Sequence, residues 1–232
     1  ISEEKPLEDI ETNYLGTFNI CEWAKINKPK KIIFTSSMAV YASSHKKLNE
    51  NSKLHPNSNY GKTKLESEYL IKSLNKHKIK TTILRLFNVY GPGQNYKNLK
   101  QGMVSIYVFY AIFKKKILVT GSLERFRDFI FISDVINVLV KVINLKDNLI
   151  LNVANGNKIT VNELLQKICK KCKLDFRTSV EITESHIGDV FGTFSDTKKL
   201  HKIYKPKINL ENGLTKIITD AKKYKNNSTL NR

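Results

Sequence analysis

Ser36-Ser37-Met38-Ala39-Val40-Tyr41 and Tyr60-Gly61-Lys62-Thr63-Lys64 are the two stretches that decide how this chain folds and what it does. An apolar, β-rich run precedes the first stretch, so Ser36 and Ser37 are expected where a strand ends. A proline and an Asn/Ser cluster precede the second stretch and favour a helix start. Because positions i and i+4 share a helix face, Tyr60 and Lys64 can point into one cleft.

A serine, a tyrosine and a lysine in this arrangement can move a proton. A phenol with its ordinary pKa near ~10 is a poor base at neutral pH. An ammonium group nearby favours the phenolate and lowers that pKa, and we expect Lys64 to act on Tyr60 in this way. The Ser37 hydroxyl can hydrogen-bond the reacting oxygen and relay its proton. The alternative is a surface tyrosine and lysine on an ordinary helix, because lysine is abundant in this chain.

Further segments accompany these two in a consistent order along the chain. The full set is Asn13–Asn19, Phe34–Tyr41, Tyr60–Lys64, Leu84–Gly93, Arg127–Val135, and Gly188–Val190 with Asp196. Together they resemble the motifs of the extended short-chain dehydrogenase/reductase superfamily, in its NAD-dependent nucleotide-sugar epimerase/dehydratase branch, which is UDP-glucose 4-epimerase-like. Each segment alone would be weak, and their shared order makes the resemblance specific.

The resemblance implies a role for each matching residue. The catalytic residues would be Ser37, Tyr60 and Lys64, with Tyr60 as the base at a sugar hydroxyl. Tyr60 and Lys64 would also contact a nicotinamide cofactor, together with Asn13, Ser36 and Phe87. The substrate, a nucleotide-diphosphate sugar, would be bound by Asn88, Arg127, His186 and Asp189. Asn88 could instead be a turn residue, and Arg127 could instead form an ion pair with Asp128 or Glu124.

The implied fold is α/β, a Rossmann-like parallel sheet lacking its first strands, with a smaller C-terminal α/β substrate lobe. Residues 1–101 would be the C-terminal part of the dinucleotide-binding domain, to which 126–153 return. Residues 102–125 and 154–225 would form mainly the substrate lobe, and 226–232 a frayed polar tail. No Gly-x-x-Gly-x-x-Gly loop follows a strand in this sequence. Since that loop holds the cofactor pyrophosphate, we expect an N-terminally truncated chain that is inactive and binds NAD poorly by itself.

The periodicity of apolar residues predicts alternating helices and strands. Helices are expected at 7–27, 58–77, 103–115, 133–145, 160–172 and 210–224. Strands are expected at 31–36, 80–87, 117–120, 127–132 and 149–153, with a loop at 88–101. Ser133 or Asp134 is expected to cap the fourth helix. Thr160 and Glu163 have the spacing of a capping box at the start of the fifth.

The composition limits the classes of partner. The net charge of +19 invites a nucleic-acid interpretation. Only five of the forty basic residues are arginine and the lysines are spread along the chain, which favours a solvated surface, so no nucleic-acid partner is expected. No apolar run is long enough to cross a membrane. A cytoplasmic location is expected, and a homodimer is expected for the full-length protein. Cys169 and Cys172 form a lone CxxC in a predicted helix, for which neither a metal nor a redox role is expected.

Two departures from the family pattern bear on the reaction. His186 stands where the family has a second phosphate- or base-binding arginine. Met38 and Ala39 stand where sugar 4,6-dehydratases place an acidic pair, which disfavours elimination of water. The resulting prediction is an NAD-dependent nucleotide-sugar epimerase that acts through a transient keto-sugar. A reductase or dehydratase of the same fold, with NADP in place of NAD, and a non-catalytic basic binding protein remain open.

Overall fold

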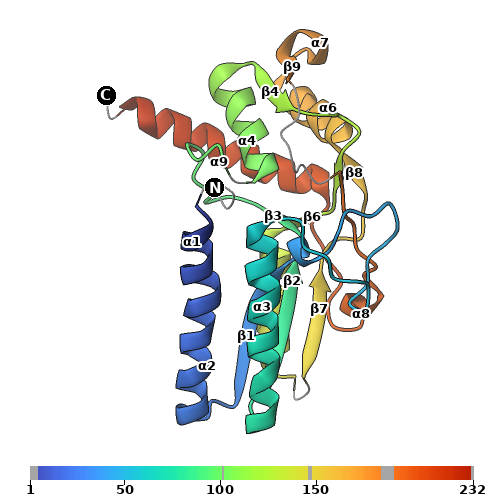
Figure 1. The fold of residues 1–232 in the computed structure, drawn as a ribbon. Coiled ribbons are helices and arrows are strands. Elements are labelled where there is room, and N and C mark those ends of the chain that lie inside the picture. The colour runs from blue at the N-terminus through green and yellow to red at the C-terminus, as the bar shows by residue number, and fades with distance from the viewer. Residues whose placement is uncertain (1–4, 101, 146–147, 184–190, 231–232) are drawn as a thin grey trace.

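The computed structural model describes residues 5–100, 102–145, 148–183 and 191–230. A lower lobe is built on a parallel sheet and an upper lobe is mainly helical (Figure 1). The sheet contains β1 (Lys31–Ser37), β2 (Lys80–Leu86) and β7 (Leu149–Val153), in the order β1-β2-β7. The α/β class with a parallel sheet is thereby confirmed.

The register of the sheet brings its three carboxyl ends to one level. Ser37 pairs with Leu86 across β1 and β2, and Leu86 pairs with Val153 across β2 and β7. β2 is almost continuously buried, as expected for a strand that has neighbours on both sides. Ligands of open parallel sheets bind beyond such carboxyl ends, so the register fixes where a site can form.

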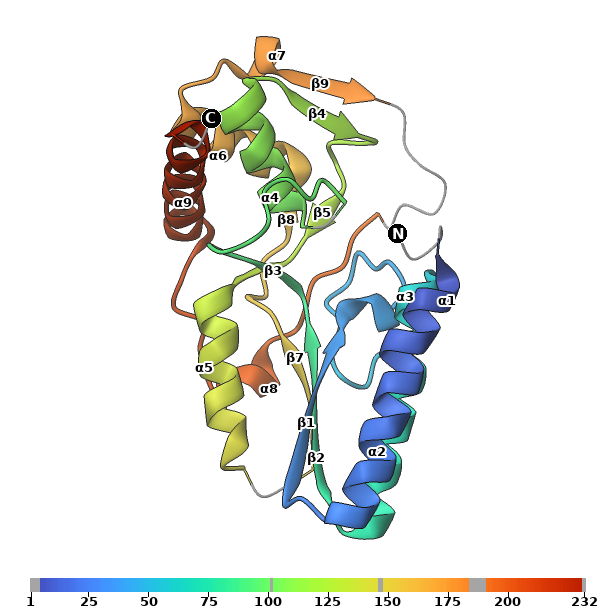
Figure 2. The same cartoon turned by 90° about the vertical axis from the view of Figure 1, so that its left-hand side faces the viewer.

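Helices cover both faces of this sheet (Figure 2). On one face lie α3 (Asn59–Ser73) and a long helix made of α1 (Pro6–Asp9), the π-helical segment η1 (Ile10–Leu15) and α2 (Gly16–Asn27). On the other face lies α5 (Ile132–Ile143). Short 3-10 segments, η2 (Met38–Val40) and η3 (Leu74–His77), follow β1 and α3.

The upper lobe packs helices around its own apolar core. Its helices are α4 (Met103–Phe109) with η4 (Tyr110–Lys114), α6 (Val161–Cys172), α7 (Phe176–Ser179) and α9 (Leu210–Leu230). β4 (Ile117–Thr120) pairs with β9 (Val180–Thr183). Between the lobes, β3 (Asn88–Tyr90) pairs with β6 (Phe129–Phe131), and β5 (Phe126–Arg127) pairs with β8 (Ile159–Thr160). The short α8 (Lys198–His201) lies beside β7.

Several local predictions are confirmed and others are wrong. The 149–153 strand is confirmed, and so is the capping box, in which Thr160 and Glu163 satisfy each other's backbone amides. The predicted cap of α5 is wrong, because the helix begins at Ile132. Asp134 instead accepts hydrogen bonds from Tyr204 and from the backbone amides of Lys207 and Ile208. A buried carboxylate needs hydrogen-bond donors, and those of Asp134 come from a loop that is distant in the sequence.

Two boundaries also differ from the sequence prediction. The predicted loop 88–101 begins with the strand β3, which pairs with β6 and so depends on a distant partner. The final helix does not end at residue 224 but continues to Leu230. Within the described residues, no helix combines the length and the apolar character that a membrane crossing requires. Cys169 and Cys172 are free thiols buried in the upper core, and burial raises the pKa of both.

Candidate active site

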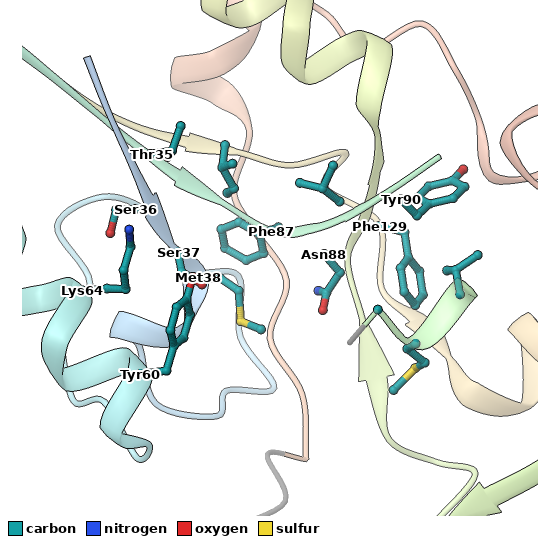
Figure 3. Close-up of a pocket in the computed structure, with 15 residues that line it drawn as sticks. Thr35, Ser36, Ser37, Met38, Tyr60, Lys64, Phe87, Asn88, Tyr90 and Phe129 are labelled. Carbon is teal, nitrogen blue, oxygen red and sulfur yellow. The ribbon is translucent and has the colours of Figure 1, made fainter. Parts of the chain in front are cut away.

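A cavity of about 410 Å³ opens at the carboxyl ends of β1 and β2 (Figure 3). Its walls come from the ends of those strands, from the start of α3, and from β3 and the start of α4. The lining residues are Thr35, Ser36, Ser37, Met38, Tyr60, Lys64, Leu86, Phe87, Asn88, Val89, Tyr90, Gly102, Met103, Val104 and Phe129. Ser37, Tyr60 and Lys64 therefore converge on one cavity.

Ser37 and Tyr60 are positioned by the carboxyl end of strand β1 and by the first turn of helix α3. The Ser37 hydroxyl accepts a hydrogen bond from the Ala39 amide at 3.2 Å and shares a second hydrogen bond with the Tyr60 phenol. Ser58 caps α3 by accepting from the Gly61 amide at 3.0 Å. Gly61 lets the helix approach η2 closely, because a Cβ there would lie 2.3 Å from the Ala39 carbonyl oxygen. The missing side chain at position 61 thus brings Tyr60 to Ser37.

The electrostatics of Tyr60 differ from the sequence prediction. Tyr60 keeps 37% of its surface exposed, yet packing around the phenol raises its pKa above the ordinary value. The hydrogen bond with Ser37 lowers the pKa and the nearby Asp9 carboxylate raises it, and both effects are smaller than that of burial. The expected lowering by Lys64 is not seen. The Lys64 ammonium instead lies 4.2 Å from the centre of the Phe34 ring, on the side of β1.

Lys64 itself is almost fully buried, with 8% of its surface exposed. Burial lowers the pKa of its ammonium, and the carboxylate of Glu68 one turn further along α3 partly offsets this by raising it. An ammonium over an aromatic face is stabilised by the ring quadrupole. Lys64 is therefore held at the cavity wall by Phe34 and by the field of Glu68.

Below the cavity floor lies a buried polar network that connects the three strands of the sheet. Glu68 accepts a hydrogen bond from Ser36 at 2.7 Å and two from Arg85, at 2.9 and 2.8 Å. Arg85 also donates to the Tyr41 hydroxyl at 2.7 Å, and Tyr41 donates to Asn152 of β7 at 2.8 Å. The side chains of Ser36, Glu68 and Arg85 are 3%, 0% and 1% exposed.

The predicted cofactor contacts lie in two places. Phe87 and Ser36 line the cavity, and the Phe87 amide donates to the Val153 carbonyl at 3.0 Å. Asn13 lies outside this cavity, on η1, where its side-chain amide is 3.4 Å from the Thr63 hydroxyl and its backbone carbonyl accepts from Ser67. In the structure Asn13 thus joins the long helix to α3.

The residues predicted to bind the substrate do not all lie at the cavity. Asn88 lines the cavity from the first position of β3, not from a turn, and donates to the Asp128 carbonyl at 3.0 Å. Arg127 is buried and donates to the carbonyls of Phe126 and Phe191, at 2.8 and 3.2 Å. Burial and the nearby Arg125 lower the pKa of the Arg127 guanidinium to about 10. His186 and Asp189 lie outside the described residues.

The possible ion pair of Arg127 with Asp128 is not supported by the position of that carboxylate. Asp128 accepts hydrogen bonds from the backbone amides of Asn155, Gly156 and Ser195, at 3.0 to 3.1 Å. Burial nevertheless raises the pKa of Asp128 to about 6. The Asp128 side chain therefore fastens two loops beside the cavity.

A second cavity of about 420 Å³ lies in the upper lobe and shares Gly102 and Met103 with the first. Arg125, Tyr107 and Tyr110 are among the residues that line it. Sequence reasoning assigned no role to Arg125, nor to Glu68 and Arg85. The available signals were the i+4 spacing from Lys64 to Glu68 and a lone arginine in the otherwise uncharged run Thr81–Leu86.

Comparisons with known proteins identify the family of this chain. Residues 1–154 match the model of the NAD dependent epimerase/dehydratase family. A putative UDP-glucose 4-epimerase from Methanocaldococcus jannaschii is 33% identical over 221 residues, which are 94% of this chain and 71% of that protein.

Two solved structures have the same architecture. The UDP-glucose 4-epimerase of Thermotoga maritima, solved with UDP-glucose, superposes with a TM-score of 0.90 at 28% identity, over 96% of this chain and 73% of that one. The UDP-glucuronic acid 4-epimerase of Bacillus cereus, solved with UDP-glucuronic acid and NAD, gives 0.84 at 25% identity, over 91% and 68%.

The family match covers both of the stretches that form the cavity wall, Ser36–Tyr41 and Tyr60–Lys64. The relatives extend the likeness through the upper lobe, since each covers more than nine-tenths of the chain. With the parallel sheet and the serine, tyrosine and lysine at its carboxyl ends, these matches place the chain in the NAD-dependent epimerase/dehydratase family.

Proposed function

We propose that this protein epimerises a nucleotide-diphosphate sugar with NAD as cofactor. The observation that carries the proposal is the convergence of Ser37, Tyr60 and Lys64 on the cavity at the carboxyl ends of β1 and β2. The relatives support it, because two solved neighbours are 4-epimerases bound to UDP-sugars. The second cavity, which shares Gly102 and Met103 with the first, offers space for the nucleotide beside the sugar.

The residues at the cavity wall fit the nicotinamide end of the cofactor. Lys64 supplies an ammonium that can donate to ribose hydroxyls, and Phe87 and Ser36 supply an apolar and a polar surface beside it. Bound NAD would supply reversible acceptance of a hydride. The glycine-rich loop that holds the pyrophosphate in this family is not among the 232 residues, so the fit is limited to the nicotinamide end.

Tyr60 is the proposed base. Its phenol oxygen takes the proton of the sugar hydroxyl as the keto-sugar forms, and gives it back when the hydroxyl is restored on the other face. Ser37 hydrogen-bonds Tyr60 and favours its ionised form, which opposes the effect of burial. Asn88, which also lines the cavity, would contact the sugar diphosphate. Arg127 would contribute a guanidinium to the phosphates, a geometry that its planar fork suits.

The composition of the wall favours epimerisation over dehydration. None of the described residues that line the first cavity is Asp or Glu, and Met38 lies on the wall where a dehydratase would need an acid. Elimination of water from the sugar needs a group that can deliver a proton to the leaving hydroxyl. Tyr60 alone cannot serve both oxygens at once, so transfer and return of hydride is the reaction that this wall supports.

The test is to incubate the protein, in a form that includes the glycine-rich loop, with NAD and a panel of UDP- and dTDP-sugars and to separate the products by chromatography. An epimerase yields the C4 epimer with no net change in NAD. A reductase consumes NADPH in proportion to product, and a dehydratase yields a 4-keto-6-deoxy sugar. A protein without any of these activities that binds DNA with a steep salt dependence would contradict the proposal and favour a basic binding protein.

A further inference from the structure

Under the cavity, the Glu68 carboxylate has three cations around it, Arg85, Lys72 and Lys64. Glu68 lies between Arg85, whose guanidinium is 2.8 Å away, and Lys72, whose ammonium is 3.7 Å away on the solvent side. Lys64 lies one helical turn before Glu68 on the same face of α3, where the two side chains are neighbours. Arg85 and Lys64 therefore compete for the same carboxylate.

Arg85 occupies both oxygens of the Glu68 carboxylate. Its Nε and Nη2 atoms donate to both Glu68 oxygens, and Ser36 donates to one of them. The remaining nitrogen, Nη1, donates to the Tyr41 hydroxyl and to the Glu50 carbonyl, at 2.7 and 3.1 Å. A bidentate fork of this kind is available to arginine and not to lysine.

Lys64 consequently has the Phe34 ring as its close neighbour and faces the cavity. An ammonium in direct contact with a buried carboxylate would be drawn down the helix, away from the strand ends. We propose that Arg85 is a positioning residue for the Tyr60–Lys64 pair, which acts by occupying both oxygens of Glu68 and so leaving the Lys64 ammonium directed at the cavity. The catalytic meaning of this placement rests on the proposed function, whereas the placement itself does not.

The charged and polar groups around Lys64 determine in which direction its protonation shifts when Arg85 or Glu68 is replaced. Glu68 and Tyr60 face Lys64 from α3, and Ser36 and Phe34 face it from β1. Arg85 of β2 acts on Lys64 through Glu68, and Asp9 of α1 acts on Tyr60. We call the pH at which half of the Lys64 side chains have lost their proton the Lys64 midpoint. Arg85→Met frees Glu68 to pair with Lys64, which raises this midpoint by about one unit. Glu68→Gln leaves a buried ammonium without its carboxylate and lowers the midpoint by a similar amount.

The double variant separates this role from a merely structural one. Glu68→Gln/Arg85→Met removes one negative and one positive charge, so the Lys64 midpoint should return to near its original value. Structural damage would move both single variants in the same direction and would not be reversed. Lys72→Met is the matched control, because it removes a cation from the same carboxylate on the exposed side, where solvent screens the charge. It should leave the midpoint unchanged.

The measurement of the Lys64 midpoint requires neither bound cofactor nor catalytic turnover. The protein is pulse-labelled with acetic anhydride across the neutral to alkaline range, and acetylation of Lys64 is followed by mass spectrometry. Opposite shifts in the single variants and recovery in the double would support the proposal. Shifts of one sign, or none, would overturn it. Should Arg85→Met fail to fold, Arg85→Lys carries the test: its single ammonium leaves one Glu68 oxygen open, so an unshifted midpoint would overturn the proposal.

Failure of this inference is distinguishable from failure of the proposed function. Opposite midpoint shifts in a protein that lacks epimerase activity would support the charge arrangement and reject the reaction. Epimerase activity with an unmoved Lys64 midpoint would support the reaction and reject the role of Arg85.

Discussion

The Ser37 hydroxyl and the Tyr60 phenol share a hydrogen bond between the end of β1 and the first turn of α3. The contact depends on a helix that can approach the strand end closely and on a serine held there by the Ala39 amide. Because the Tyr60 phenol lines the cavity beside Ser37 and can act as a base once ionised, its environment governs the proposed chemistry.

In a form of the protein that includes the glycine-rich loop, Tyr60→Phe is expected to lower turnover by a factor on the order of 10² or more, the usual scale for loss of a general base. Binding of the nucleotide-sugar should change little, because the ring that shapes the cavity remains. Turnover and calorimetric affinity measure the two effects. Tyr69→Phe is the matched control, since Tyr69 lies on the exposed face of the same helix. Equal turnover in the two variants would show that another group is the base.

Ser37→Ala is expected to move the acid limb of the pH–rate profile to higher pH, by up to roughly one unit. The hydrogen bond with Ser37 lowers the pKa of Tyr60, so its loss raises that pKa further and the phenolate forms only in more alkaline solution. Ser73→Ala, at the far end of α3, should leave the profile in place. A profile that loses height but keeps its midpoint would argue against this role.

Glu68→Gln should lower the free energy of unfolding by about 3–5 kcal/mol, because it leaves the buried Arg85 guanidinium without its carboxylate, and Arg85→Met should lower it by less, because Lys64 can then pair with Glu68. The double variant should lose less than the sum of the two, since no lone charge remains. Urea denaturation of all four proteins gives the coupling energy. Additive losses would mean that the 2.8 Å ion pair contributes nothing beyond its separate members.

Gly61→Ala is expected to destabilise the protein by about 1–3 kcal/mol and to lower turnover, because the new methyl group meets the Ala39 carbonyl and forces α3 away from η2. Gly16→Ala is the control in the neighbouring helix α2. Its Cβ would lie at an ordinary 3.7 Å from the nearest atom, so the substitution should stabilise the helix by up to roughly 1 kcal/mol. Opposite signs in thermal unfolding are the expected result.

Asp128 should make stability fall as the pH rises. Burial raises its pKa to about 6 in the folded protein from an ordinary 3.8, so between these values the folded state holds a proton that the unfolded chain has lost. The free energy of unfolding therefore declines with rising pH across that window, by roughly 2–3 kcal/mol from this group. Asp128→Asn should remove the decline, and parallel curves for the two proteins would contradict the assignment.

Much of the secondary structure could be predicted from the sequence because its signals are local. The strand at 149–153 and the capping box of Thr160 follow from runs and spacings within a few residues. The sequence predicts a loop where β3 lies, since the pairing of β3 with β6 connects distant segments. It predicts a cap at Ser133 or Asp134 because the partners of Asp134 at 204, 207 and 208 lie far along the chain.

The site shows the same division. The i+4 spacing and a strand end suffice to bring Tyr60, Lys64 and Ser37 to one cavity. The direction of the Tyr60 pKa shift could not be predicted, because it depends on how the phenol packs and on where the Lys64 ammonium lies. Glu68 and Arg85 were missed for a related reason: a charge inside an apolar run reveals that a partner must exist, but not which residue it is.

The contact between Tyr41 and Asn152 bears on the order in which the protein can mature during synthesis. Asn152 belongs to the last strand of the sheet, yet it completes the hydrogen bonds that fix Tyr41 and, through Tyr41, Arg85. A nascent chain that ends before residue 152 therefore carries Ser37, Tyr60 and Lys64 but lacks the hydrogen bond that completes the network of Tyr41, Arg85 and Glu68. Release of β7 from the ribosome supplies that hydrogen bond, so the network under the cavity is completed only late in synthesis.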